Sequence, residues 1–292
     1  MHNLTCTNIT KRYKDKEALS QLNLTLESGK IYGLIGRNGA GKTTLLSVLT
    51  AQNPQTEGSV TLDGEAVWEN QKALDCLCFS RELNTSSTSG SAGIKIRDYL
   101  KAASYYYPHW DRELAERLVQ AFKIDTKKAM SRVNKGMLSA VTITVALASK
   151  APFTFLDEPV AGLDVIAREF FYKTLVEEFA ESGRTFVIST HIIEEAASIF
   201  EEVIILKDGR LLCKENTEAL LNRAVRVNGL AAEVDAATAG LDCRHIETIG
   251  RGKTVTVILK EDESLPEGYD VTVQPVSLQQ LFVALCGEEG MA

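Results

Sequence analysis

The chain has 292 residues, of which 45% are hydrophobic and 24% charged, the ordinary mix of a soluble globular protein. Its formal net charge of −7 disfavours general nucleic-acid binding, which begins when Lys and Arg neutralise phosphates. No apolar run is long enough to cross a bilayer, and the N-terminus has no apolar signal segment. The six cysteines form no Cys-x-x-Cys pair, which favours the cytoplasm. A role at the inner face of the cell membrane would therefore require spans from another chain.

Strand-like and helix-like segments alternate up to about residue 222, which predicts an α/β domain. Antiparallel pairing is indicated at the turn dipeptides Asp63-Gly64 and Asp208-Gly209, each of which lies between two strand-like runs. The expected helices cover residues 42–49 and 164–181. The expected strands cover residues 31–35, 59–62, 66–68, 76–80, 153–156, 186–188, 202–206 and 211–214.

Two regions interrupt this alternation. Residues 84–93 are rich in Ser, Thr and Gly and predict a mobile loop, after which residues 94–150 are mostly helical. Beyond residue 222 a small α+β unit is expected, with strands at 254–259 and 271–273 and a helix at 278–286. We expect a large domain at residues 1–222, a helical subdomain within it at about 84–150, and a small accessory domain at residues 223–292.

A glycine-rich loop supplies the strongest chemical signal. Residues 36–43 read Gly-Arg-Asn-Gly-Ala-Gly-Lys-Thr between an expected strand and an expected helix, which is the pattern of a P-loop. Backbone N–H groups of such a loop surround phosphate oxygens, and the helix N-terminus attracts the same anion. Lys42 can reach the β- and γ-phosphates of ATP, and the Thr43 hydroxyl can ligate Mg²⁺. The predicted nucleotide-binding residues of this loop are Gly36, Asn38, Gly39, Ala40, Gly41, Lys42, Thr43 and Thr44.

Two carboxylates, Asp157 and Glu158, follow the apolar strand at 153–156. Asp157 can hold Mg²⁺, directly or through water, and Glu158 can accept a proton from an attacking water. Strands often end in acidic residues, so this pattern takes its weight from the P-loop upstream. His191 follows the next apolar strand, where it would approach the γ-phosphate. A lone histidine is more often structural, but this position favours a functional role.

Four motifs occur in a fixed order: the P-loop, Leu-Asp-Glu-Pro at 156–159, Ala-Gly-Leu-Asp at 161–164, and Ser-Thr-His at 189–191. Together they resemble the nucleotide-binding subunit of an ABC transporter, over roughly the first three-quarters of the chain. Tyr-Tyr-Pro-His-Trp-Asp at 106–111 and the small C-terminal domain are similar to ATPase subunits of bacterial ABC exporters, which pair with a separate permease. The resemblance implies a P-loop NTPase core of ABC ATPase type with an antiparallel β edge, a helical subdomain and a small C-terminal α+β domain.

The resemblance also implies roles for single residues. Tyr13 would stack on adenine, whereas an ordinary exposed tyrosine is the plainer interpretation. Residues 161–164 would form the D-loop, which touches a partner subunit. Two subunits would bind head to tail, with each ATP between one P-loop and the signature loop of the other subunit. Hydrolysis would separate them and drive the permease.

The signature loop departs from the family pattern of Leu-Ser-Gly-Gly-Gln. The best candidate is Val-Asn-Lys-Gly-Met at residues 133–137. Gly136 keeps a glycine that lets the backbone approach phosphate, and the amide of Asn134 can replace the serine as a hydrogen-bond donor. Lys135 adds positive charge where a γ-phosphate would arrive, and Met137 cannot make the polar contacts of glutamine.

The Q-loop is the second departure, because the family places glutamine after the strand at residues 76–80. Glu82 lies nearest the expected place and can ligate Mg²⁺ through oxygen, while adding a charge. Asn84 can take this role instead, and Glu82 as a solvated loop carboxylate is an equal alternative. Both departures bear on turnover more than on nucleotide binding.

The sequence thus predicts an ATP-hydrolysing subunit that powers a separate transmembrane permease as a homodimer or heterodimer, with ATP and Mg²⁺ and without nucleic acid. The predicted catalytic residues are Glu158, His191 and Lys42, and the predicted metal ligands are Thr43, Asp157 and Glu82. One alternative is a soluble ABC ATPase acting on ribosomes or DNA, although such proteins usually carry two cassettes or long coiled coils. The other is a nucleotide-gated regulatory module with little turnover, which the altered loops suggest.

Overall fold

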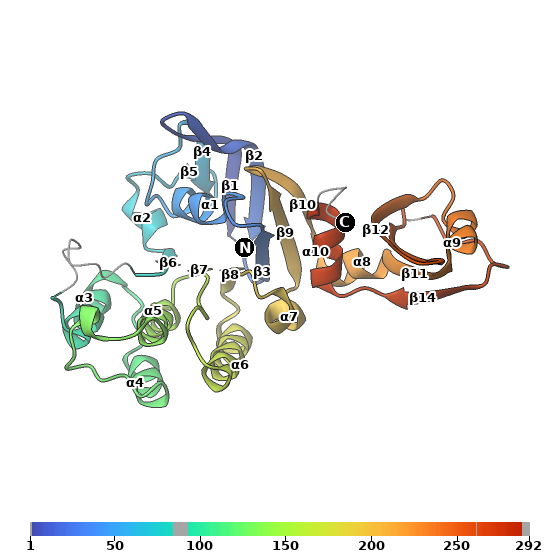
Figure 1. Cartoon of the computed structure of the whole chain (residues 1–292). Coiled ribbons are helices and arrows are strands. Elements are labelled where there is room, and N and C mark those ends of the chain that lie inside the picture. The colour runs from blue at the N-terminus through green and yellow to red at the C-terminus, as the bar shows by residue number, and fades with distance from the viewer. Residues whose placement is uncertain (1, 84–92, 261, 288–292) are drawn as a thin grey trace.

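A computed structural model describes residues 2–83, 93–260 and 262–287, arranged around three β-sheets (Figure 1). The central sheet has the strand order β10-β9-β3-β8-β7-β6. Its strands are β3 (Ile31–Gly36), β6 (Leu77–Ser80), β7 (Phe153–Asp157), β8 (Thr185–Ser189), β9 (Glu202–Lys207) and β10 (Arg210–Asn216). All neighbours pair in parallel except β10, which returns antiparallel after the predicted turn at Asp208-Gly209.

The strands β3, β7 and β8 are buried along their whole length, which explains their unbroken apolar sequences. Because the carboxyl ends of parallel strands meet at one edge of a sheet, the residues that follow these strands are brought together there. The P-loop, the Asp157–Glu158 pair and His191 all occupy such positions. The expected α/β core is therefore confirmed, and it places the predicted chemistry along one edge.

An antiparallel sheet of order β2-β1-β4-β5 forms the predicted β edge. It contains β1 (Asn3–Tyr13), β2 (Lys16–Glu27), β4 (Glu57–Leu62) and β5 (Glu65–Ala66), with the short helix α2 (Gln71–Leu74) after it. Helix α1 (Lys42–Leu49) shares one apolar core with this sheet and with the central sheet. The helix that follows the P-loop is thus held from both sides.

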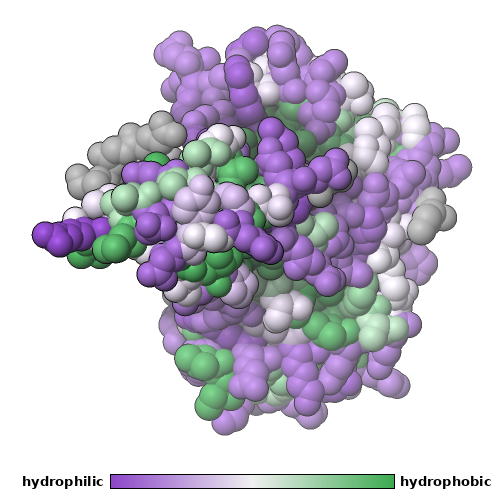
Figure 2. All heavy atoms as spheres, turned by 90° about the vertical axis from the view of Figure 1, so that its right-hand side faces the viewer, coloured by the Kyte–Doolittle hydropathy of each residue, from purple (hydrophilic) through white to green (hydrophobic). Residues whose placement is uncertain are grey.

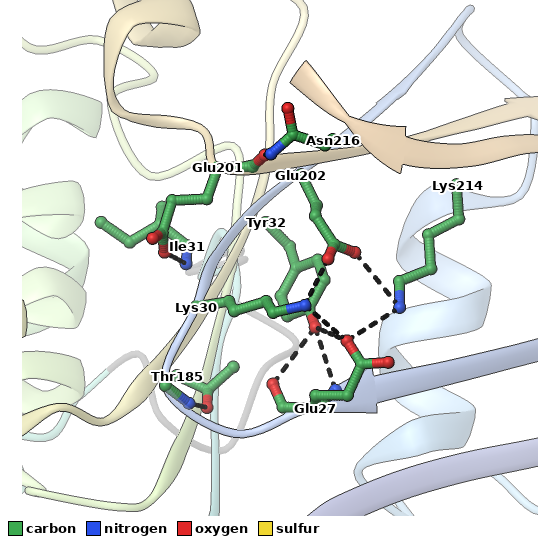
Figure 3. Close-up of polar contacts among 10 residues, drawn as sticks. Glu27, Lys30, Ile31, Tyr32, Thr185, Glu201, Glu202, Lys214 and Asn216 are labelled. Carbon is green, nitrogen blue, oxygen red and sulfur yellow. Dashed lines mark hydrogen bonds and ion pairs between the residues drawn. The ribbon is translucent and has the colours of Figure 1, made fainter. Parts of the chain in front are cut away.

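Lysine and glutamate side chains join the two sheets near the start of β3 (Figure 3). Lys30 Nζ lies 2.8 Å from Glu27 Oε2 and also contacts Glu202, while Lys214 Nζ lies 3.2 Å from both carboxylates. The hydrogen bond from Lys30 is the main cause that lowers the pKa of Glu27 to about 2. This cluster fastens the strand that leads into the P-loop to β2, β9 and β10.

A helical region lies between β6 and β7, as expected. It contains α3 (Ile96–Tyr106), α4 (Arg112–Ala121), the 3₁₀ turn η1 (Met130–Arg132) and α5 (Lys135–Ala148). The loop predicted at residues 84–93 lies almost entirely outside the described residues. Helix α6 (Val165–Ser182) follows β7, and α7 (Ile193–Ala196) with the 3₁₀ turn η2 (Ala197–Ile199) follows β8.

The third sheet, of order β12-β13-β11-β14, begins after α8 (Thr217–Asn222). It contains β11 (Ala224–Leu230), β12 (Asp242–Ile249), β13 (Gly252–Ile258) and β14 (Val271–Pro275), with a small core shared with α9 (Ala231–Ala237). The sequence predicts β13 and β14 but not β11, α9 or β12. Hydrophilic residues cover most of the face on this side of the molecule, with scattered apolar ones (Figure 2). The final helix, α10 (Leu278–Cys286), leaves the third sheet and packs against the central domain.

Candidate functional site

The P-loop turns sharply into α1. Gly41 has a φ of 103°, in a region that favours glycine, and α1 begins at the next residue. Lys42 is only 8% exposed, and its Nζ donates a hydrogen bond of 2.7 Å to the Gly36 carbonyl. Burial lowers the pKa of Lys42, while the carboxylates of Glu158 and Asp157 act in the opposite direction. The lysine side chain therefore lies across its own loop, beside both acidic residues.

A pocket of about 330 Å³ opens at this loop and gathers most of the predicted site. Its predicted members are Tyr13, Asn38, Gly39, Gly41, Lys42, Thr43, Thr44, Asp157 and Glu158. Sequence reasoning missed Lys16 and Ala18, which line the same pocket from the start of β2. The basic turn beside Tyr13 was a signal for Lys16, whereas Ala18 carried none. Gly36 lines a neighbouring cavity, and Ala40 is buried within the loop.

Thr43 and Asp157 meet at this pocket although they are far apart in the chain. Thr43 Oγ1 donates a hydrogen bond of 2.6 Å to Asp157 Oδ2, and Ser189 Oγ donates to Oδ1 of the same carboxylate. A hydroxyl and a carboxylate are the hard oxygen ligands that Mg²⁺ prefers, so this pair fits the ion. Ser189 was not predicted, and it holds the carboxylate in place.

Glu158 and His191 are also brought together. His191 Nδ1 lies 2.6 Å from Glu158 Oε2. The backbone of Glu158 has a φ of +49°, which residues other than glycine rarely adopt, and its N–H donates to the Ser189 carbonyl at 3.1 Å. This strained turn after β7 directs the carboxylate toward the loop that follows β8.

The turn at Asp208-Gly209 and the strand β2 enclose the P-loop. A Cβ atom added at Gly41 or at Gly209 would lie 2.7 Å from the same oxygen, the carbonyl of Ala18. Gly209 N–H donates to the Ala40 carbonyl at 3.1 Å, and Ser20 N–H donates to the Gly209 carbonyl at 2.9 Å. Three segments from different parts of the chain are thus packed backbone against backbone.

Tyr13 ends β1 and lines the P-loop pocket with 43% of its surface exposed. Lys11 Nζ lies 4.9 Å from the centre of its ring, within the range of a cation–π contact. The ring is available at the pocket, and its stacking on adenine stays a prediction.

The signature segment, residues 133–137, lies at the start of α5. Asn134 caps this helix, because its Oδ1 accepts a hydrogen bond of 2.8 Å from Met137 N–H. A Cβ atom at Gly136 would lie 2.2 Å from the Gly162 carbonyl oxygen, so glycine is needed there for contact with the D-loop, residues 161–164. Ser139 Oγ adds a hydrogen bond of 2.6 Å to the Ala161 carbonyl. Sequence reasoning attributed this glycine to phosphate approach alone.

Glu82 pairs with the signature segment. Its Oε1 lies 3.1 Å from Lys135 Nζ, and both side chains are about half exposed. The two departures from the family pattern therefore contact each other. The P-loop pocket does not include Glu82, Asn134 or Gly136, all of which the structure describes. The structure thus does not bring Glu82 to Thr43 and Asp157, where its predicted role as a metal ligand would place it.

Comparison with known proteins agrees with this geometry. The sequence profile of the ABC transporter family matches residues 19–161. The uncharacterized ABC transporter ATP-binding protein MJ1023 of Methanocaldococcus jannaschii is 30% identical over 211 residues, which cover 70% of this chain and 73% of that protein. The chain belongs to the ATP-binding subunits of ABC transporters. This subunit is an ATPase that binds ATP.

Some relatives match almost the entire chain. Nod factor export ATP-binding protein I of Sinorhizobium fredii is 26% identical over 300 residues, covering 97% of this chain and 85% of that protein. Among solved structures, a dimeric post-hydrolysis state of the cassette MJ0796 bound to ADP and Pi has the same fold, with a TM-score of 0.63 and 24% identity. That likeness covers 73% of this ABC subunit and 98% of the other chain. Across residues 2–83, 93–260 and 262–287, no helix has the length and apolar character needed to span a membrane.

Proposed function

We propose that this ABC subunit powers a separate membrane permease, in an exporter, by forming an ATP-sandwich dimer on the cytoplasmic face of the membrane. One observation supports the proposed dimer: the P-loop pocket contains Asp157 and Glu158 but not the signature segment. A second ATPase subunit, identical or different, would supply that segment across the nucleotide. The export direction is supported by the relatives named for Nod factor export, which match the chain over nearly its full length.

The proposed reaction is hydrolysis of the γ-phosphate bond of ATP. Lys42 and the free N–H groups at the start of α1 bind the phosphates. Glu158 accepts the proton of the attacking water, and His191, held by its 2.6 Å contact with Glu158, binds the γ-phosphate. Thr43 and Asp157 would hold Mg²⁺, which when bound would offset the negative charge on the phosphates.

The permease contact is proposed for the helical region. Tyr105 and Tyr106 at the end of α3 are 78% and 60% exposed, and aromatic side chains are enriched in protein interfaces. We also propose the division into a nucleotide-binding domain at residues 1–222 and an accessory domain at residues 223–292. Under this proposal the tyrosines and the accessory domain lie on different parts of the subunit.

Steady-state ATP hydrolysis with Mg²⁺ tests the reaction when the purified parent is compared with Glu158→Gln. The variant should lose at least about 100-fold in turnover, the usual contribution of a general base, yet elute as a dimer with ATP in size-exclusion chromatography. Glu194→Gln is the control, because Glu194 is exposed on α7, close to His191 in the chain. If parent and Glu158→Gln both bind ATP but neither turns it over nor dimerises, the homodimer is excluded, and a different partner subunit must complete the site.

A further inference from the structure

Helix α10 belongs to the core of the ATPase although it is the last described element of the chain (Figure 1). Leu278 and Leu281 are 2% and 0% exposed and share the main apolar core with Ile193 of α7. A capping box fixes the start of the helix, since Ser277 and Gln280 bond each other's backbone N–H at 3.2 and 2.9 Å. The C-terminal helix is therefore firmly seated on the segment that follows His191.

Phe282 of α10 reaches a second cavity, of about 340 Å³, beside the P-loop. The loops after β3 and β8 form its other walls. The polar side of this cavity comes from residues Arg37, Asn38, Thr190 and His191. Phe282 of α10 thus lines the same cavity as the histidine loop, residues 190–193.

The side chain of His191 has one polar partner among the described residues, the carboxylate of Glu158, while Thr190 and Ile192 anchor the loop in the interior. His191 is 60% exposed on its side chain and is held by Glu158, while Ile192 N–H donates to Thr190 Oγ1 at 3.0 Å. Below this loop, Ile193 is 3% exposed and packs in the core that α10 completes. Removing the Phe282 ring would enlarge the cavity that His191 lines and would take an apolar side chain away from the core in which Ile193 packs, so the loop would be held less firmly.

We propose that Phe282 is a positioning residue for ATP hydrolysis, which holds the loop at residues 190–193 so that His191 faces the γ-phosphate. The proposal rests on the role assigned above to His191. Phe282 is absent from the pocket of Lys42, Thr43 and Asp157, although its own cavity also borders Gly36 and Asn38 of the P-loop. The proposal therefore expects a larger effect on hydrolysis than on nucleotide binding. Two residues, Val276 and Ser277, connect β14 to α10, and α10 also contacts β12 of the third sheet.

The test compares Phe282→Ala with Val283→Ala, the neighbouring position of α10, which is 38% exposed and outside the cavity. Phe282→Ala should lower kcat by about 10-fold or more while KM for ATP stays within about two-fold, because a misplaced group costs rate more than binding. Val283→Ala should match the parent, and Phe282→Leu should restore most of the rate. A parental kcat for Phe282→Ala overturns the proposal.

A double variant separates positioning from general destabilisation. If Phe282 acts through His191, adding Phe282→Ala to His191→Ala should lower kcat no further, because residues acting as a unit are not additive. An additive loss would show that Phe282 works by another route and would overturn the proposal. His191→Ala alone tests the earlier assignment: a parental rate for that variant would remove the role of His191, whatever the Phe282 variants do.

Discussion

The P-loop and the signature segment each lie at the N-terminus of a helix, yet the first N–H groups of the two helices are capped differently. At α1 the cap is Gly41, and within the described residues no side chain bonds the first N–H groups of the helix. At α5 the side chain of Asn134 already accepts the Met137 N–H. The first helix thus keeps its donors free for an anion, whereas the second satisfies one of them internally.

The lysines of the two segments, Lys42 and Lys135, also differ in burial and in the group that each contacts. Lys42 is buried and lies against its own loop, while Lys135 is about half exposed and pairs with Glu82 on the surface. In the proposed dimer, the P-loop half of the site is therefore assembled within one copy. The signature segment is a surface feature that would act on the nucleotide of the partner copy, so variants in the two regions should behave differently.

Among variants that compare the two helix starts, the largest effect is expected from Lys42→Ala. A hydrogen bond to a charged group contributes about 1.5–3 kcal/mol, so affinity for ATP should fall roughly 10- to 100-fold. Calorimetric titration with ATP-Mg²⁺ measures this loss, with Lys72→Ala on α2 as an exposed control. Parental affinity in Lys42→Ala would mean that the P-loop half is not the one that binds phosphate.

The second largest effect is expected from Gly136→Ala, on the free energy of unfolding. Its methyl group would collide with the Gly162 carbonyl, and overpacking typically costs about 1–3 kcal/mol in the free energy of unfolding. Urea unfolding measures this cost, while ATP affinity should be unchanged because the pocket lies elsewhere. Gly93→Ala is the control, because no described atom lies within 4 Å of the Cβ position at Gly93. Equal stability of the two variants would contradict the contact between the signature segment and the D-loop.

Two variants of Asn134 distinguish its role as a helix cap from its predicted role in contacting phosphate. Asn134→Ala should lose about 1 kcal/mol of stability through the missing cap. Asn134→Asp keeps the capping oxygen but removes the N–H donor, so it should be as stable as the parent and slower in ATP turnover. Unchanged turnover in the aspartate variant would leave Asn134 as a cap alone.

The smallest effect is expected at the Glu82–Lys135 pair. Exposed ion pairs contribute about 0.2–1 kcal/mol, and a double-mutant cycle of Glu82→Gln and Lys135→Met should return a coupling in that range. Added salt should reduce it. A coupling that resists salt would show that the pair is more enclosed than its exposure indicates.

The residues that sequence reasoning identified are those whose signal is local. A few consecutive positions are enough to predict the P-loop, Asp157 with Glu158, and the helix at residues 278–286. The roles of Ser189 and Phe282 depend on contacts between distant segments, which no short pattern encodes. The strands β1 and β2 were not predicted, because polar residues interrupt their apolar residues. The domain boundary near residue 222 stays a prediction, and α10 packs across it.

The carbonyl of Ala18, which lies close to both Gly41 and Gly209, limits which substitutions the chain tolerates at these two positions. Any side chain at either position would meet the same oxygen, and both positions also have a positive φ. In a library of random variants selected for nucleotide binding, both positions should therefore retain glycine, although one lies in the P-loop and the other in a distant hairpin. Gly209, which does not line the P-loop pocket, should therefore prove as intolerant of replacement as Gly41 in the P-loop.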